Sequence, residues 1–274
     1  MQKLSARLKA GGKTVGLVPT MGYLHEGHLS LIKNSKQKSD VTVVSIFVNP
    51  TQFAPNEDLK KYPRDLEKDK KLLRKYGVDY LFLPSEKEIY PKNFQSYVEV
   101  KNISKILEGE FRPTHFKGVT TIVSILFNSV NPDYAFFGQK DAQQAAIIKQ
   151  MVKDLKFNIK IIVCPIIRES DGLAMSSRNI YLSNQERSDA LILNKSLRTA
   201  EKIIKEGERS SSKIINAAVK MVNSVASSQL DYLRIVESAT FTEVKKLIRG
   251  KSYYILVACK VGKTRLIDNI LIKI

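Results

Sequence analysis

The stretch that decides the fold is Pro19-Thr20-Met21-Gly22-Tyr23-Leu24-His25-Glu26-Gly27-His28, which follows an apolar run at residues 14–18. An apolar run, a glycine-containing turn and then helical periodicity at residues 28–38 predict a strand, a tight turn and a helix. This order is the first half of a βαβ unit. We therefore expect a parallel sheet.

The pattern repeats along the first two thirds of the chain. Further strand-like runs lie at residues 41–48, 79–83, 134–137 and 159–163, and they alternate with helical patterns at residues 66–76, 119–130 and 142–155. Asp141 stands where a side chain could cap the last of these helices. Alternation of strands and helices predicts helices packed on both faces of the sheet.

After residue 167 the pattern changes. Ser183-Asn184-Gln185-Glu186 has the form of a capping box and predicts a long helix to about Gly207, and a serine-rich turn at residues 210–212 starts another. Runs at residues 232–236, 253–261 and 264–267 then predict a small antiparallel sheet. We expect an α/β protein with two domains: a Rossmann-like parallel-sheet domain at residues 1–167 and a smaller α+β domain at residues 168–274.

Composition narrows the class of protein. The chain has 274 residues, 43% of them hydrophobic, yet its apolar stretches, such as residues 161–167, are far shorter than a membrane-spanning helix. Residues 1–10 lack the apolar run of a signal peptide. Cys164 and Cys259 each lie within a β-like apolar run, which is typical of buried reduced thiols. We expect a soluble, cytoplasmic protein without a membrane partner.

The chain has 45 Lys and Arg against 27 Asp and Glu, a net charge of +18. Such an excess suggests a nucleic-acid partner. The positive charge is however spread evenly over both halves, and the dense group at residues 68–75 has the spacing of a solvated helix face with acidic residues interleaved. We expect anionic small molecules rather than nucleic acid as partners.

Two of the three histidines, His25 and His28, lie in the turn at the start of the first long helix. Unpaired N–H groups and the helix dipole make such a position an anion site, and imidazoles there can stabilise charge on phosphate. A zinc site would need further ligands, and His115 is the only other histidine. Two histidines that merely cap the helix remain an alternative.

The turn sequence resembles the signature of the pantoate–β-alanine ligase family, within the nucleotidyltransferase superfamily. An ordered set of further motifs extends the resemblance over nearly the whole chain: Phe47-Val48-Asn49-Pro50-Thr51-Gln52-Phe53, Tyr62-Pro63-Arg64, Arg112-Pro113-Thr114-His115-Phe116-Lys117-Gly118-Val119, Phe137-Gly138-Gln139-Lys140-Asp141, Gln143-Gln144, and Arg168-Glu169-Ser170-Asp171-Gly172-Leu173-Ala174-Met175-Ser176-Ser177-Arg178-Asn179. The resemblance implies condensation of (R)-pantoate with β-alanine to pantothenate through a pantoyl adenylate, with ATP as a substrate, release of AMP and pyrophosphate, and a homodimer.

The resemblance also implies site residues. His28, assisted by His25, would act at the phosphate. We expect it to stabilise charge there rather than to act as a general acid. Gln52 and Gln144 match positions that hold pantoate, and Gln52 would also lie near β-alanine. The ATP site would comprise Met21, Gly22, Tyr23, Leu24, His25, Glu26, Gly27, His28, Gly138, Gln139, Lys140, Asp141, Ile167, Met175, Ser176, Ser177 and Arg178.

Two positions depart from the family pattern. Gln139 stands where Glu is usual, and Thr114 where Gly is common, which leaves the roles of Arg112 and His115 open. Lys140 would neutralise phosphate charge, while Asp141 would contact the nucleotide or cap the helix. The loop from Met175 to Arg178 would form part of a lid over ATP.

Mg²⁺ would arrive with ATP, held mostly by phosphates and water, so no protein metal cage is expected. Asp65 and Asp69 are candidate contacts, although a charged helix face accounts for them equally. Two other functions compete with the ligase reading. One is a nucleotidylyltransferase that uses the same two-histidine turn, and the other is a basic RNA-binding protein.

Overall fold

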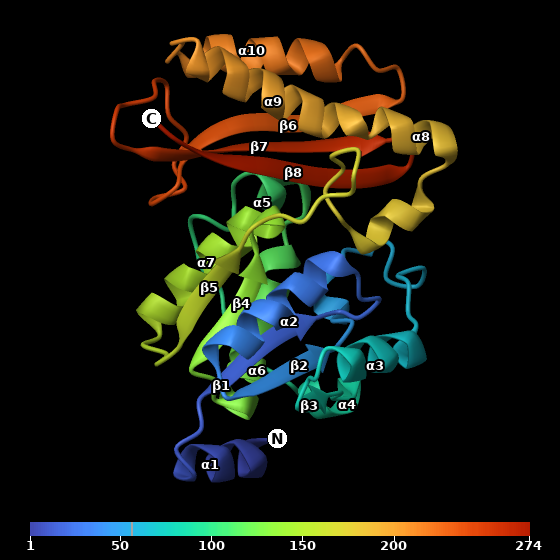
Figure 1. Ribbon diagram of the computed structural model, residues 1–274, viewed down its shortest axis with the longest axis vertical. Coiled ribbons are helices and arrows are strands. Elements are labelled where there is room, and N and C mark those ends of the chain that lie inside the picture. Colours follow the sequence, from blue (N-terminus) through green and yellow to red (C-terminus); the bar gives the residue numbers. More distant parts are fainter. Residues whose placement is uncertain (56) are drawn as a thin grey trace. The chain divides into compact units, whose positions relative to one another are not determined.

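The computed structural model describes residues 1–55 and 57–274. The chain forms two compact units, Met1–Ile166 and Ile167–Ile274, which are shown in Figure 1. The division falls one residue before the expected boundary, so Ile167 belongs to the second unit.

The first unit contains a parallel sheet with the strand order β3-β2-β1-β4-β5. Every neighbouring pair in it is parallel. The strands are β1 (Val15–Thr20), β2 (Val41–Ile46), β3 (Tyr80–Phe82), β4 (Tyr134–Gly138) and β5 (Lys160–Cys164). The chain leaves β1 toward β2 on one side and later returns to β4 on the other. The strand order therefore reverses between β1 and β4, which is where open α/β sheets bind ligands at the carboxyl ends of the strands.

Apolar side chains alternate between the two faces of this sheet. Leu17 and Val43 pack on the face covered by α6 and α7, whereas Val18 and Val44 pack against α2 and α3. The expected doubly covered parallel sheet is confirmed. Its helices are α1 (Gln2–Ala10), α2 (Glu26–Lys38), α3 (Leu66–Lys75), α4 (Glu86–Ile89), α5 (Glu108–Phe111), α6 (His115–Val130) and α7 (Ala142–Asp154), with single 3₁₀ turns η1 (Pro50–Gln52) and η2 (Gln139–Asp141).

The second unit is a three-stranded antiparallel sheet, β6 (Ser228–Glu237), β7 (Ser252–Val261) and β8 (Thr264–Lys273), as expected. The helices α9 (Leu191–Lys205) and α10 (Ser211–Val222) pack against it through a shared apolar core, and Figure 1 shows them on one face. The unit begins with a short hairpin at residues 167–175, and the 3₁₀ helix η3 (Ser177–Tyr181) follows it.

The long helix expected after Ser183 is divided in two, so that prediction is wrong in part. Ser183 and Glu186 do form the predicted capping box, but it opens only α8 (Asn184–Asp189). At Ala190 the backbone tightens, because its carbonyl accepts a hydrogen bond from the N–H of Leu193, three residues on, rather than four. A tighter 3₁₀-type turn of this kind interrupts α-helical bonding.

Both cysteines are free and buried, which confirms the expected reduced thiols. Within residues 1–55 and 57–274, no helix is both long and apolar enough to cross a membrane.

Candidate active site

The turn after β1 is shaped by two residues in the left-handed region. Gly22 has a φ of +82° and Tyr23 one of +53°. A Cβ on Gly22 would lie 3.0 Å from Cγ2 of Ile46 and 3.1 Å from Oδ2 of Asp69. Glycine is therefore needed here for both its backbone freedom and its lack of a side chain. The result is a turn that passes close to α3 before α2 begins.

Asp69 on α3 holds this turn through its main chain. Its Oδ2 accepts a hydrogen bond from the N–H of Tyr23 at 2.8 Å, and its Oδ1 accepts one from the N–H of Leu24 at 2.7 Å. The Asp69 residue is only 1% exposed. Charge-assisted hydrogen bonds to two successive N–H groups fix the local path of the chain. Asp69 is thus not part of a solvated helix face, and both its oxygens are already engaged.

The two histidines together form a capping box at the start of α2. Nδ1 of His25 accepts a hydrogen bond from the N–H of Gly27 at 3.1 Å, and Nδ1 of His28 accepts one from the N–H of His25 at 3.3 Å. The ring centroids are 4.1 Å apart. Since each Nδ1 accepts, a neutral ring carries its proton on Nε2. The histidines can therefore cap the helix and also bind an anion. Capping through Nδ1 sets the tautomer in which Nε2 carries the proton.

The pKa of His28 is held well below the usual value for histidine, first by burial and then by the nearby charges of His25 and Lys140. His28 is accordingly neutral at physiological pH. A neutral imidazole with its proton on Nε2 is a hydrogen-bond donor and a poor proton source. The charge of Lys140 acts on His28 although the two residues follow different strands, His28 in α2 after β1 and Lys140 in η2 after β4.

Lys140 belongs to η2, directly after β4, which is the neighbour of β1 at the point where the strand order reverses. Gly138 ends β4, and Gln139 and Asp141 complete the turn. The expectation that Asp141 caps α7 is wrong: its side chain makes no capping hydrogen bond and instead lies 3.6 Å from Nζ of Lys140. The preceding 3₁₀ turn runs directly into α7, so the helix start does not use this carboxylate.

Gln52 ends η1, which follows β2 at the same edge of the sheet. Its side-chain Oε1 accepts a hydrogen bond from Nδ2 of Asn49 at 3.0 Å. Asn49 is fully buried and also donates to the carbonyl of Gly118, while its Oδ1 accepts from the Tyr90 hydroxyl at 2.8 Å. Because Asn49 occupies Oε1, the Nε2 amide group of Gln52 is the part left to donate to a ligand.

Asn49 belongs to one of the sequence motifs, but the sequence indicated no role for it. A buried asparagine directly after a strand was the available signal, because an amide in that position must satisfy several hydrogen bonds. Its partners, Tyr90 and the carbonyl of Gly118, are far away in the sequence and could not be read from it.

Adjacent glutamines on α7 differ in environment. Gln143 is 3% exposed, and its amide bridges the carbonyls of Ile103 and Ile106 at 2.8 and 2.7 Å and the N–H of Glu108 at 3.1 Å. Gln144, the predicted substrate contact, is half-buried, and within the described part of the chain its amide makes no hydrogen bond. Gln143 thus supports the structure, whereas Gln144 retains its capacity to bind a ligand.

The remaining predicted ATP contacts lie in the second unit. The N–H of Met175 donates to the carbonyl of Ile167 at 3.0 Å, which closes a short hairpin. Ser176 caps η3 by accepting from the N–H of Arg178 at 3.2 Å, and Ser177 is buried in the first turn of that helix.

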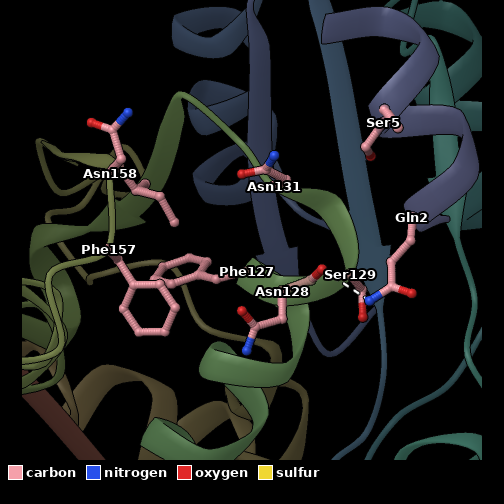
Figure 2. Close-up of a pocket in the computed structure, with 10 residues that line it drawn as sticks. Gln2, Ser5, Phe127, Asn128, Ser129, Asn131, Phe157 and Asn158 are labelled. Atoms are coloured by element: carbon pink, nitrogen blue, oxygen red, sulfur yellow. Dashed lines mark hydrogen bonds between the residues drawn. The ribbon is translucent and has the colours of Figure 1, made fainter.

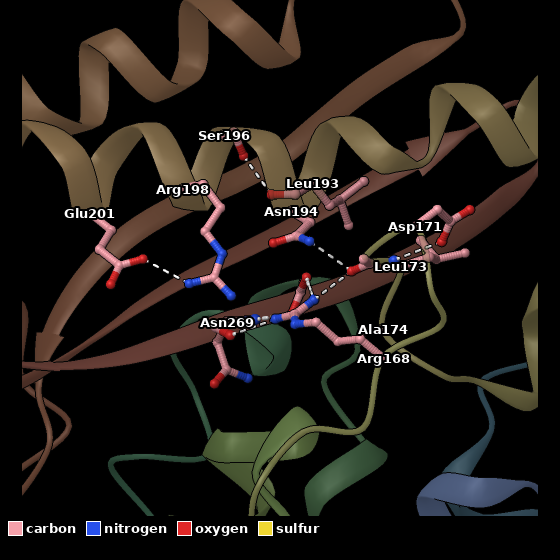
Figure 3. Close-up of polar contacts among 12 residues, drawn as sticks. Arg168, Asp171, Leu173, Ala174, Leu193, Asn194, Ser196, Arg198, Glu201 and Asn269 are labelled. Carbon is pink, nitrogen blue, oxygen red and sulfur yellow. Dashed lines mark hydrogen bonds and ion pairs between the residues drawn. The ribbon is translucent and has the colours of Figure 1, made fainter.

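Buried polar contacts hold this hairpin, as Figure 3 shows. Arg168 forms a two-pronged ion pair with Asp268, at 2.6 and 2.9 Å, and also donates to the carbonyl of Gly172 at 3.0 Å. Asn194 donates to the same carbonyl at 2.8 Å. Both terminal nitrogens of the motif residue Arg168 are therefore engaged within the unit.

A cavity of about 300 Å³, shown in Figure 2, lies elsewhere in the first unit. It is lined by uncharged residues, among them Gln2, Phe127 and Asn158. None of the predicted site residues lines it. Within the described residues, no group of three or more His, Cys, Asp or Glu side chains could hold a metal ion.

Comparison with known proteins agrees with this arrangement. Residues 1–271 match the sequence profile described as pantoate-beta-alanine ligase. The pantothenate synthetase of Caldicellulosiruptor bescii is 53% identical over 273 residues, which cover 100% of this chain and 96% of that one.

Solved structures extend the likeness to three dimensions. The crystal structure of pantothenate synthetase from Thermus thermophilus superposes with a TM-score of 0.91 at 41% identity, covering 97% of this chain and 96% of the other. A ligase from Francisella tularensis, solved with beta-gamma ATP and β-alanine, has a TM-score of 0.75 at 39% identity, covering 98% and 95%. Coverage, identity and fold agree over the full length: the chain belongs to the pantoate–β-alanine ligase family of enzymes.

Proposed function

We propose that this ligase joins pantoate to β-alanine in two steps. An oxygen of the pantoate carboxylate attacks the α-phosphorus of ATP, which forms pantoyl adenylate and expels pyrophosphate. The amine of β-alanine then attacks the acyl carbon, and AMP leaves with the carboxylate oxygen. The observation that carries this proposal is the neutral His28, which lies with His25 at the start of α2 and near the charge of Lys140, where the strand order of the sheet reverses.

His28 would stabilise the phosphate during the first step. Its tautomer offers Nε2–H to a phosphoryl oxygen as negative charge shifts onto the leaving pyrophosphate. Because the lowered pKa keeps the ring neutral, His28 would donate a hydrogen bond rather than transfer a proton. His25, whose Nδ1 is also occupied, would supply a parallel donor. The main-chain turn at residues 21–24 would bind the nucleotide, with the start of α2 contributing its dipole.

Lys140 would neutralise the phosphates as a point charge. Gly138, Gln139 and Asp141 would line the same end of the sheet. ATP is the nucleotide that this site suits, and the beta-gamma ATP bound to the Francisella tularensis ligase supports that assignment.

Gln52 and Gln144 would hold pantoate, with Gln52 also near β-alanine. Amides suit this substrate because its hydroxyl groups and carboxylate need both donors and acceptors. Support comes from the free Nε2 of Gln52 and from the unbonded amide of Gln144 within the described residues. The Francisella tularensis complex includes β-alanine, which supports the second substrate.

Residues 167–178 of the second unit would contribute the lid over ATP, through Ile167, Met175, Ser176, Ser177 and Arg178. Support for this role comes from the motif and from the ordering of the hairpin by Arg168. An Arg fork and serine hydroxyls suit a triphosphate.

Mg²⁺ would be carried mainly by the phosphates of ATP, where it would offset their charge. The donor set fits this arrangement, because Asp69 is fully occupied by main-chain N–H groups and Asp65 caps α3, whereas the side chain of Asp141 is 45% exposed beside Lys140. We further propose a cytoplasmic homodimer, which light scattering of the purified protein would test.

Exchange of labelled pyrophosphate into ATP tests the first step. With wild-type protein, exchange should require pantoate and proceed without β-alanine, because adenylate formation is reversible. His28→Ala should abolish most of it while the protein remains folded. Exchange that proceeds equally without pantoate would overturn the proposal.

A further inference from the structure

The main-chain carbonyl of Gln52 is held by two side chains from a single short segment. Nη2 of Arg112 donates to it at 3.2 Å, and Nδ1 of His115 lies 2.9 Å from it. Arg112 directly follows α5, and His115 is the first residue of α6. The carbonyl of a proposed substrate-binding residue is thus fixed from outside its own loop.

The hydrogen-bond partners of His115 set its tautomer. Nη1 of Arg112 lies 3.2 Å from Nε2 of His115. A guanidinium can only donate, so Nε2 must accept, and Nδ1 carries the proton that goes to the Gln52 carbonyl. The pKa of His115 is lowered to about 3, first by burial and then by the charge of Arg112, so this tautomer persists at physiological pH.

Arg112 is itself neutralised and oriented. Its Nε and Nη2 donate to the two carboxylate oxygens of Glu57, each at 2.7 Å. Such two-pronged pairing fixes the guanidinium plane. Neither side chain is then a spare cation for a substrate carboxylate: Arg112 is paired and His115 is uncharged. Their geometry serves the loop that carries Gln52.

We propose that Arg112 and His115 are positioning residues, which determine where the Gln52 amide stands when pantoate binds. The inference rests on the proposed role of Gln52. Asn49 fixes one end of the side chain through Oε1, and the clamp on the carbonyl fixes the other end through the main chain. With both ends held, the Nε2 group of Gln52 is presented in one direction, which favours recognition by a preorganised donor.

Thr114, which lies between the two residues of the clamp, does not disturb it. It has a φ of −94°, which any residue can adopt, and its exposed side chain makes no capping hydrogen bond. Threonine in place of the more common glycine therefore leaves the clamp intact.

Replacing His115 separates its two contacts. Asparagine places an amide N–H near the position of Nδ1 and can keep the bond to the Gln52 carbonyl, whereas glutamine reaches the position of Nε2 and alanine keeps neither. We expect His115→Ala to raise the KM for pantoate about tenfold, with the KM for ATP changed less than about twofold. His115→Asn should remain closer to the parent enzyme than His115→Gln. A merely structural role would lower the melting temperature and raise both KM values together, which would overturn the inference.

A double-mutant cycle with Gln52→Ala decides whether His115 acts through Gln52. If it does, adding His115→Ala to Gln52→Ala should change the KM for pantoate by less than about twofold. If His115→Ala still raises the KM for pantoate tenfold in the Gln52→Ala variant, the inference is contradicted. If Gln52→Ala alone leaves the KM for pantoate unchanged, the proposed role of Gln52 fails and the inference falls with it. If Gln52→Ala raises it but His115→Ala does not, only the inference is overturned.

Arg112→Ala should reproduce the rise in the KM for pantoate. The matched control is Arg198→Ala, which removes an arginine from an exposed ion pair with Glu201 on α9. That control should leave both KM values unchanged.

Discussion

The turn after β1 and the hairpin at the start of the second unit both carry motif residues, yet their charged groups do different work. In the turn, one buried carboxylate, that of Asp69, accepts two main-chain N–H groups, and capping through Nδ1 leaves the proton of neutral His28 on Nε2. In the hairpin, the charge of Arg168 is satisfied internally by Asp268. A motif charge therefore indicates a ligand only when the fold leaves it unpaired.

Glu169 and Asp171 extend this contrast, because Arg187 pairs with both of them, at 2.9 and 2.8 Å. Gly172 has a φ of +99°, and a Cβ there would lie 2.3 Å from Nδ2 of Asn194. The polar side chains of the hairpin thus hold its structure, whereas the turn after β1 carries the candidate catalytic histidines. Substitutions should distinguish polar residues that hold the structure from those that bind a ligand.

The largest effect is expected at His28. His28→Ala should lower kcat/KM about 10³-fold, because it removes a donor to the phosphate, and it should leave the melting temperature within a few degrees of the parent. Steady-state assays of AMP formation and thermal unfolding measure the two quantities. A loss of activity below tenfold would mean that the turn presents no essential donor.

Arg168→Met should destabilise the second unit by about 3 kcal/mol, because it leaves the Asp268 carboxylate, 3% exposed as a residue, without its buried partner. Urea unfolding followed by circular dichroism measures this change. The exposed Arg198→Ala serves again as control, with an expected change of less than about 0.5 kcal/mol. Equal effects of the two variants would contradict the internal role of Arg168.

Asp69→Asn should raise the KM for ATP and destabilise the first unit by about 2 kcal/mol, because an amide N–H₂ would face one of the two main-chain N–H groups. Asp65→Asn is the matched control on the same helix, since Asp65 only caps α3. It should leave the KM for ATP unchanged. If Asp69 instead contacted the metal, its variant would require more Mg²⁺ for half-maximal activity, and the structural role of Asp69 in the turn after β1 would be wrong.

The smallest effect, per histidine and per pH unit, is the change of stability with pH. The pKa values of His28 and His115 are lowered in the folded protein, so the unfolded chain binds protons first as the pH falls below about 6.5. Their stabilising contribution is thus complete above that pH and declines toward lower pH. Each contributes at most about 1.4 kcal/mol per pH unit.

His115→Asn removes one of these titrating groups while it retains a donor for Gln52. The slope of unfolding free energy against pH between 4 and 6 should therefore decrease by up to one proton relative to the parent. Denaturant titrations at several pH values measure it. An unchanged slope would show that His115 does not resist protonation in the folded state.

Much of the fold follows from local patterns. Short apolar runs such as residues 41–48 can only be buried in a doubly covered strand, so the parallel sheet was predictable from them. The break at Ala190 was not, because residues on both sides of it continue one helical periodicity. Helix α1 was missed as well, since its polar sequence has little apolar periodicity.

The candidate site divides in the same way. The two histidines lie at the start of the helix that follows β1, where parallel sheets bind ligands, so a local pattern indicated them, whereas Lys140 was assigned from the resemblance to the family. The structural roles of Asp69 and Asn49 were not predicted, because their partners come from segments distant in the sequence. Asp141 looked like a helix cap by position alone, but the 3₁₀ turn before α7 turns its carboxylate toward Lys140.

The most direct test of the central claim follows oxygen atoms through the reaction. The enzyme is supplied with ATP, Mg²⁺, β-alanine and pantoate labelled with ¹⁸O in its carboxylate. The ¹⁸O content of the products is then measured by mass spectrometry. The account predicts one ¹⁸O atom in each AMP formed, because the carboxylate oxygen that attacks the α-phosphorus leaves with AMP. Unlabelled AMP, or label in inorganic phosphate released with ADP, would contradict it.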